Sequence, residues 1–209
     1  MEDYHLNTVY YYNAEDYASS VQFGQAFFSL LREQVTPNQT LIFLCIGSDR
    51  ATGDSLGPLI GYKLEQHSNQ NYLVYGTLES PVHAKNLATV VEEIHSRHKN
   101  PYIIAIDASL GKQAHIGYYT LGVGALKPGA GVGKDLISVG DVFITGIVNL
   151  SGLLDRMLLQ TTRLHTVMSL ADRIYLGIRY GLNLFAEQSS SANRRMVSLS
   201  TLQTSRSYV

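Results

Sequence analysis

Two aspartates, Asp54 and Asp107, lie close to the ends of apolar runs that are typical of buried strands. Asp54 is in the turn GSDRATGDSLGP (residues 47–58), which follows the run TLIFLCI, and Asp107 ends the run IIAID (residues 103–107). In a parallel sheet covered by helices, residues just beyond the carboxyl ends of neighbouring strands face one crevice. We therefore expect the two carboxyl groups to meet there and to carry the chemistry.

A pair of carboxyl groups in one crevice favours hydrolytic chemistry. At a separation of about 4 Å and an effective dielectric constant near 20, two negative charges repel by about 4 kcal/mol, which corresponds to about three pKa units. The pair can share a proton, so that one group acts as a base on water while the other donates to the substrate, or a metal ion can lie between them. Either arrangement activates water.

Each candidate residue also has an ordinary structural interpretation. Asp54 can cap the helix that begins beside it, and Asp107 can close a turn by accepting a backbone N–H. Asp49 is more typical of a turn residue. If a metal ion were bound with a histidine ligand, His83 and His115 would be the candidates. Single loop histidines are, however, more often surface or hydrogen-bonded residues. We place both histidines outside the core site.

The segments around these residues alternate between strand-like runs and helical periods. Strands are predicted at 40–46, 72–75, 102–106, 116–121 and 142–148, and helices at 14–35, 56–64, 87–99, 150–159 and 164–184. The order strand, helix, strand, helix, strand argues for right-handed crossovers and a parallel sheet. We expect a single α/β domain over 1–209, with an ordered core at 14–186. A mobile tail is expected at 187–209, because that segment lacks a sustained apolar period.

Composition excludes several classes of partner. The formal net charge is −1 and only 16% of the residues are charged, which does not support a nucleic-acid or anionic-membrane surface. The single cysteine, Cys45, lies in an apolar run and is expected to be a small buried residue without an internal disulfide. The amino-terminal residues do not form a secretory signal, and no apolar run reaches the roughly 20 residues that span a bilayer. We expect a soluble, cytoplasmic protein.

The loop at 126–140 is rich in glycine but does not predict a nucleotide site. Pro128 stands where the first glycine of a phosphate-binding loop belongs, and Asp135 replaces the hydroxyl residue that would hold magnesium. We expect backbone N–H groups of Gly131 and Gly133 to approach the crevice and Lys134 to lower its negative potential. The alternative is a flexible connection with turn glycines.

Three blocks of the sequence together resemble a known family. CIGSDRATGDSLGPLIG (residues 45–61), IIAIDASLG (103–111) and GAGVGKDLISVGDVFITGIVN (129–149) occur in the order found in sporulation proteins of the YyaC type. That family is similar to the spore germination protease and more distantly to hydrogenase maturation peptidases. The resemblance implies a three-layer α/β/α sandwich of the phosphorylase/hydrolase-like kind, with a mostly parallel sheet of about five strands.

The resemblance also implies roles for individual residues. The two aspartates taken as the catalytic pair of the germination protease correspond to Asp54 and Asp107, although Gly53 and Ser55 replace its proline and alanine. Thr52, in the same string, is expected to contact the substrate. The maturation peptidases use a later histidine as a third metal ligand, and residues 116–164 contain no histidine, so we expect neither a bound metal nor another cofactor.

The leading hypothesis is a sporulation-associated hydrolase of the forespore or spore interior. As an endopeptidase, it would use Asp54 and Asp107 to activate water against a peptide or protein substrate, with small acid-soluble spore proteins as the candidate class. The alternatives are a noncatalytic sporulation protein that binds a peptide or partner in the same crevice, and a metal-dependent maturation-type peptidase. The family resemblance also predicts a homo-oligomer.

Overall fold

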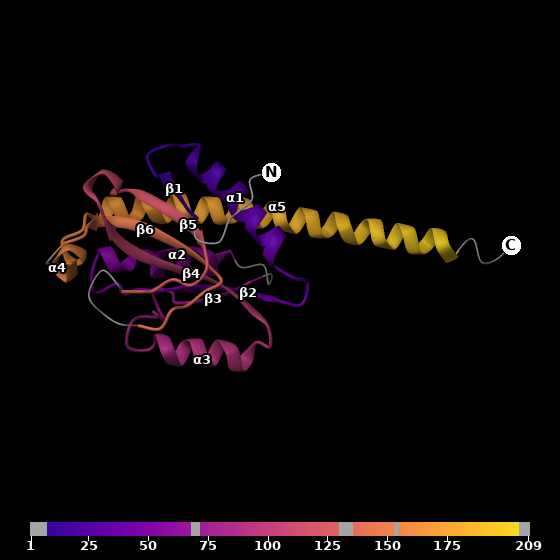
Figure 1. The fold of residues 1–209 in the computed structure, drawn as a ribbon, viewed down its shortest axis with the longest axis horizontal. Coiled ribbons are helices and arrows are strands. Elements are labelled where there is room, and N and C mark those ends of the chain that lie inside the picture. Colours follow the sequence, from indigo (N-terminus) through magenta and orange to yellow (C-terminus); the bar gives the residue numbers. More distant parts are fainter. Residues whose placement is uncertain (1–7, 68–71, 130–135, 153–154, 205–209) are drawn as a thin grey trace.

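A six-stranded sheet forms the centre of the fold in the computed structural model, which describes residues 8–67, 72–129, 136–152 and 155–204 (Figure 1). The spatial order is β1-β5-β6-β4-β2-β3. Strands β2, β3, β4 and β6 run parallel, whereas β5 is antiparallel to β6 and β1 is antiparallel to β5. The strands are β1 Val9–Asn13, β2 Thr40–Cys45, β3 Leu73–Tyr75, β4 Pro101–Gly111, β5 Tyr118–Val123 and β6 Val142–Leu150.

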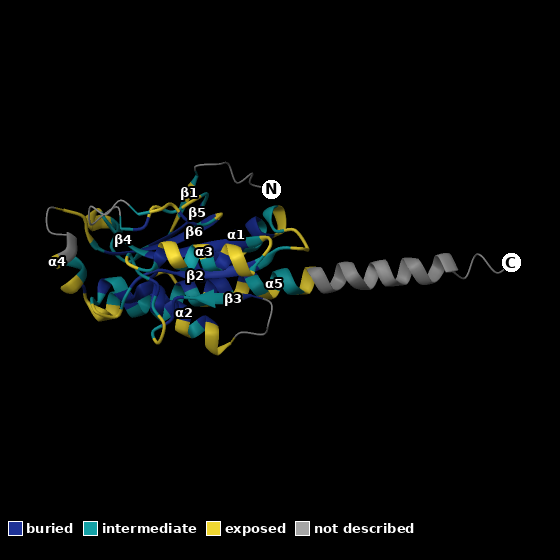
Figure 2. Ribbon diagram, turned by 90° about the horizontal axis from the view of Figure 1, so that it is seen from below, coloured by how far each residue is buried: buried dark blue, intermediate teal, exposed yellow. Residues whose placement is uncertain are grey.

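The central strands are apolar on both faces because helices cover both sides of the sheet. Along β2, Leu41, Phe43 and Cys45 contribute to one hydrophobic core, while Ile42 and Leu44 contribute to the other. This division follows from the two-residue period of a strand, in which successive side chains point to opposite faces. Figure 2 shows central strands coloured as buried, with α3 lying in front of them in this view.

The helices divide between the two faces of the sheet. Residues of α1 (Ser19–Gln34), α2 (Leu56–Gln66) and α5 (Leu164–Thr204) build one core, and residues of α3 (Leu87–Arg97) build the other. Figure 1 shows α3 on one side of the sheet with α1 and α5 on the other, and the short helix α4 (Asp155–Gln160) at one end. The predicted three-layer α/β/α sandwich with a mostly parallel sheet is confirmed.

The largest differences from the sequence prediction concern β1, β4 and α5. The strand β1 was not predicted, and it forms an edge by pairing with β5. Strand β4 continues to Gly111 because β6 accompanies it that far, so Asp107 lies within a strand and not at its end. Helix α5 continues to Thr204, beyond the predicted end at Leu184, in a segment with neither glycine nor proline to stop a helix.

Helix α5 is long, but it lacks the apolar character of a membrane-spanning helix. The helix has 41 residues, and its carboxyl-terminal part projects away from the sheet (Figure 1). Within the described residues, however, no helix combines the length and the apolar character needed to cross a membrane. The mobility expected for 187–209 stays a prediction.

Candidate active site

Asp107 occupies a position where one neighbouring strand has ended and the other continues. On one side, β2 ends at Cys45, which pairs with Ile106, and on the other side Asp107 itself pairs with Thr145 of β6. Asp107 shares its face of β4 with Ala105, which belongs to the core beneath α3. The side chain therefore lies on the α3 face, at the level where the end of β2 opens the sheet.

Asp54 reaches the same region from the turn after β2. It lies in a single 3-10 turn, Gly53–Ser55, which leads directly into α2. The backbone of Gly47 has a φ of +140° and passes so close to the Asp54 carbonyl that a Cβ atom would overlap it. The adjacent Ser48 N–H donates a hydrogen bond to that carbonyl at 3.0 Å. A glycine at position 47 thus lets the chain fold back and fix Asp54.

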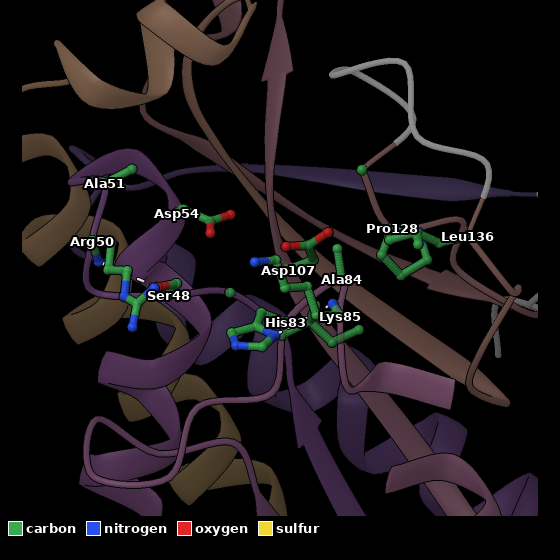
Figure 3. A pocket seen from close by; sticks show the side chains of 13 residues that line it. Ser48, Arg50, Ala51, Asp54, His83, Ala84, Lys85, Asp107, Pro128 and Leu136 are labelled. Atoms are coloured by element: carbon green, nitrogen blue, oxygen red, sulfur yellow. Dashed lines mark hydrogen bonds between the residues drawn. The ribbon is translucent and has the colours of Figure 1, made fainter. Parts of the chain in front are cut away.

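The two carboxyl groups face each other across a gap (Figure 3). Asp107 is only 7% exposed, and Asp54 is half-buried. Burial raises the pKa of Asp107 well above its ordinary value, and the negative charge of Asp54 raises it further. Hydrogen bonds from the backbone N–H groups of Ala108, at 2.8 Å to Oδ1, and of Gly129 lower the pKa in part. Of the two carboxyl groups, Asp107 is therefore the one whose surroundings favour the protonated form.

The structural alternatives for the aspartates are only partly observed. Ser55, not Asp54, is the residue that precedes α2, and no side-chain hydrogen bond caps that helix. Asp107 lies within a strand, but it does accept backbone N–H groups, from the next residue, Ala108, and from Gly129 in the turn that follows Pro128. Asp49 lies in a turn, as predicted, and does not line the cavity.

Both aspartates line an open cavity of about 240 Å³ (Figure 3). Its walls combine the two acids with basic, hydroxyl and apolar groups, so that it offers hydrogen-bonding atoms on an otherwise apolar surface. The lining residues are Ile46, Gly47, Ser48, Arg50, Ala51, Asp54, His83, Ala84, Lys85, Asp107, Pro128, Gly129 and Leu136.

Sequence reasoning missed several of these residues, His83 above all, which it left outside the core site. The segment 81–86 follows β3, whose neighbour in the sheet is β2. Val82 forms a parallel bridge with Ile46, directly beyond the end of β2. The signal available in the sequence was the position of SPVHAK directly after the second predicted strand, since loops that follow parallel strands share the same edge of the sheet. His115, by contrast, packs against Tyr11 and Tyr118 and does not line the cavity.

The donor set does not match a metal centre. Across the described residues, no three or more His, Cys, Asp or Glu side chains gather as metal ligands do. In addition, Nδ1 of His83 accepts a hydrogen bond from the Lys85 N–H at 3.3 Å, so the neutral ring carries its proton on Nε2. This ring therefore presents a donor to the cavity where a metal would need a lone pair.

The predicted substrate-binding residues have different outcomes. Gly131, Gly133 and Lys134 lie outside the described residues, so their predicted role remains a prediction. Thr52 does not line the cavity; its carbonyl accepts a hydrogen bond from the Ser55 hydroxyl at 2.6 Å and thereby supports the turn that holds Asp54.

Comparisons with known proteins agree with the predicted family. Residues 11–177 match the family described as "Protein of unknown function (DUF1256)". The chain is 46% identical over 168 residues to the uncharacterized protein YyaC of Bacillus subtilis (strain 168), over 80% of this chain and 81% of that protein. These matches confirm the YyaC-type resemblance. Among solved structures, the chain is similar to the Hydrogenase 3 Maturation protease, with a TM-score of 0.39 and 13% identity over 66% of this chain and 87% of that chain.

Proposed function

The chain belongs to the DUF1256 family, and we propose that it is a hydrolase, more specifically an endopeptidase, in which Asp54 and Asp107 activate water against a peptide bond. The observation that carries this proposal is the asymmetry of the pair. Burial and the charge of Asp54 raise the pKa of Asp107, whereas Asp54 is half-buried in a turn. Two carboxyl groups whose environments separate their protonation states are the arrangement that acid–base hydrolysis requires.

The reaction balances with these two groups alone. Ionised Asp54 takes a proton from a water molecule, whose oxygen bonds to the peptide carbon, while protonated Asp107 donates to the carbonyl oxygen. The resulting tetrahedral adduct collapses when Asp54 passes its proton to the amide nitrogen and the C–N bond breaks. The hydroxyl proton returns to Asp107, and the free carboxylic acid and amine leave with both aspartates in their starting states.

The mixed lining of the cavity favours the proposal of a polypeptide substrate. Its walls include apolar groups of Ile46, Ala51 and Leu136 together with polar groups of Ser48 and His83. We propose small acid-soluble spore proteins as the substrate class and the forespore as the site of action, on the resemblance to the germination protease. The predicted homo-oligomer remains part of the same proposal.

The test is cleavage of a purified small acid-soluble spore protein, followed by mass spectrometry of the fragments. Asp54→Asn and Asp107→Asn should each lower the turnover number by about 10²- to 10⁴-fold, the range for loss of a general acid or base. Asp49→Asn is the matched control, because Asp49 lies in the same turn region but does not line the cavity. Cleavage that persists in both cavity variants would eliminate the mechanism. Binding without cleavage by the wild type would favour a noncatalytic partner-binding protein.

A further inference from the structure

His83 lies on the wall of the cavity, beside the two aspartates, and nothing in the proposed hydrolysis uses it (Figure 3). The side chain is half-buried and comes from the loop between β3 and α3. Asp54 and Asp107 already account for every proton transfer in the reaction. A role for His83 must therefore concern how the substrate is held.

The chain fixes the His83 backbone by a reciprocal set of hydrogen bonds with Asn86. The His83 N–H donates to Asn86 Oδ1 at 2.8 Å, and the N–H groups of Asn86 and Leu87 both donate to the His83 carbonyl at 3.0 Å. The Asn86 side-chain amide also donates to the Pro81 carbonyl at 3.1 Å. This arrangement holds residue 83 in place at the start of α3, so the ring needs little ordering when a substrate binds.

The ring has one nitrogen engaged and one available. Because Nδ1 accepts the Lys85 N–H, the proton of the neutral ring is on Nε2. Among the described residues, no partner for Nε2 is found. A preorganised N–H donor on the wall of a cavity is a group that a bound carbonyl oxygen would satisfy.

We propose that His83 is a substrate-binding residue whose Nε2–H donates a hydrogen bond to a backbone carbonyl of the bound polypeptide, next to the bond that the aspartates hydrolyse. This inference rests on the proposed function. An extended polypeptide presents a carbonyl at every residue, so one fixed donor sets which peptide bond lies between Asp54 and Asp107. His83 thereby selects the register of the substrate.

Two substitutions separate this role from a structural one. His83→Asn keeps an acceptor close to the position of Nδ1, so it preserves the contact with Lys85, but its shorter side chain places no donor at the position of Nε2. His83→Gln places an amide N–H close to the position of Nε2 and removes the acceptor. The loss of a hydrogen bond to a non-reacting carbonyl weakens substrate binding without changing the chemical step, so KM changes more than kcat.

The experiment measures kcat and KM on a purified small acid-soluble spore protein for the wild type, both His83 variants and His115→Asn as a control outside the cavity. We expect His83→Asn to raise KM about tenfold with kcat within about twofold, and His83→Gln and His115→Asn to stay within about twofold of the wild type. An unchanged KM in His83→Asn, or a larger loss in His83→Gln, would overturn the role of His83 while leaving the aspartate mechanism intact.

A second measurement needs no substrate. Imidazole ¹⁵N–¹H spectra of the free protein at pH 8 should show His83 as the Nε2–H tautomer, and the Nδ1–H tautomer would overturn the inference. Failure of the wild type to cleave the spore protein at all would contradict the proposed function, and the inference built on it would fall as well.

Discussion

Asp54 and Asp107 face each other across one cavity, although one belongs to a half-exposed turn and the other to the interior of a buried strand. This difference in setting makes the pair asymmetric. The negative charge of Asp54 adds to burial in raising the pKa of Asp107, so the two groups do not ionise alike.

The rate of hydrolysis should fall as the pH rises through the raised pKa of Asp107. Asp107 acts as the acid, so the active enzyme carries its proton, and this form is lost on the alkaline side. The measurement is kcat/KM against pH for the wild type. A rate that stays level across the range in which Asp107 loses its proton would contradict the assignment of the acid.

Asp107→Asn should stabilise the protein at neutral pH. The folded-state pKa of Asp107 lies above its unfolded value, so the folded protein binds more protons in the interval between them and the wild type loses stability as pH rises through it. The variant cannot ionise and keeps an acceptor for the Ala108 N–H. We expect a gain of about 0.5–2 kcal/mol at pH 7.

Urea unfolding of the wild type and Asp107→Asn at pH 7 and at pH 4 measures this effect. The gain should shrink at pH 4, because Asp107 is then protonated in the folded wild type. A variant that is less stable than the wild type at pH 7 would contradict a folded-state pKa of Asp107 above its unfolded value.

Gly47→Ala should lower both stability and activity. The new Cβ would overlap the Asp54 carbonyl at a backbone φ of +140°, which displaces the catalytic turn. We expect a loss of about 2 kcal/mol. Gly117→Ala is the matched control, because its φ is +86° but nothing lies within 4 Å of the added Cβ. Urea unfolding and cleavage assays should show a smaller loss of stability and normal activity in the control.

Asn86→Ala should weaken substrate binding although residue 86 is not part of the cavity wall. Asn86 does not line the cavity, but its side chain accepts the His83 N–H and donates to the Pro81 carbonyl. We expect a loss of about 1 kcal/mol in stability and a rise in KM that resembles His83→Asn. Asn86→Asp keeps the acceptor for the His83 N–H but loses the amide that donates to Pro81. Its stability and its KM should therefore lie between those of the wild type and those of Asn86→Ala. A wild-type KM in Asn86→Ala would show that the ring is oriented by other contacts.

The periodic parts of this fold were readable from the sequence. The run 41–46 is apolar at every position, which requires cover on both faces, and the structure provides it with α3 on one face and α1, α2 and α5 on the other. The bounds of α2, α3 and β2 are close to the predicted ones. The alternation of strands and helices along the sequence predicted a parallel sheet, and Asp54 and Asp107 meet at its carboxyl edge.

Features that depend on a partner strand were not readable. Whether β4 ends at residue 106 or continues to Gly111 is decided by β6, which is 31 or more residues further along the chain and supplies the hydrogen bonds. The place of His83 depends in the same way on the Val82 bridge to Ile46. No local pattern in SPVHAK distinguishes a ring in a cavity from one on the surface.

The most direct test of the account is the titration of the Asp107 carboxyl group, followed by carbon NMR, in the wild type and in Asp54→Asn. We expect the pKa of Asp107 to lie well above that of an ordinary aspartate in the wild type and to fall in the variant, because removal of the Asp54 charge leaves burial as the remaining cause. An Asp107 that titrates as an ordinary aspartate, or one that ignores the substitution at position 54, would contradict the coupled pair on which the hydrolytic mechanism depends.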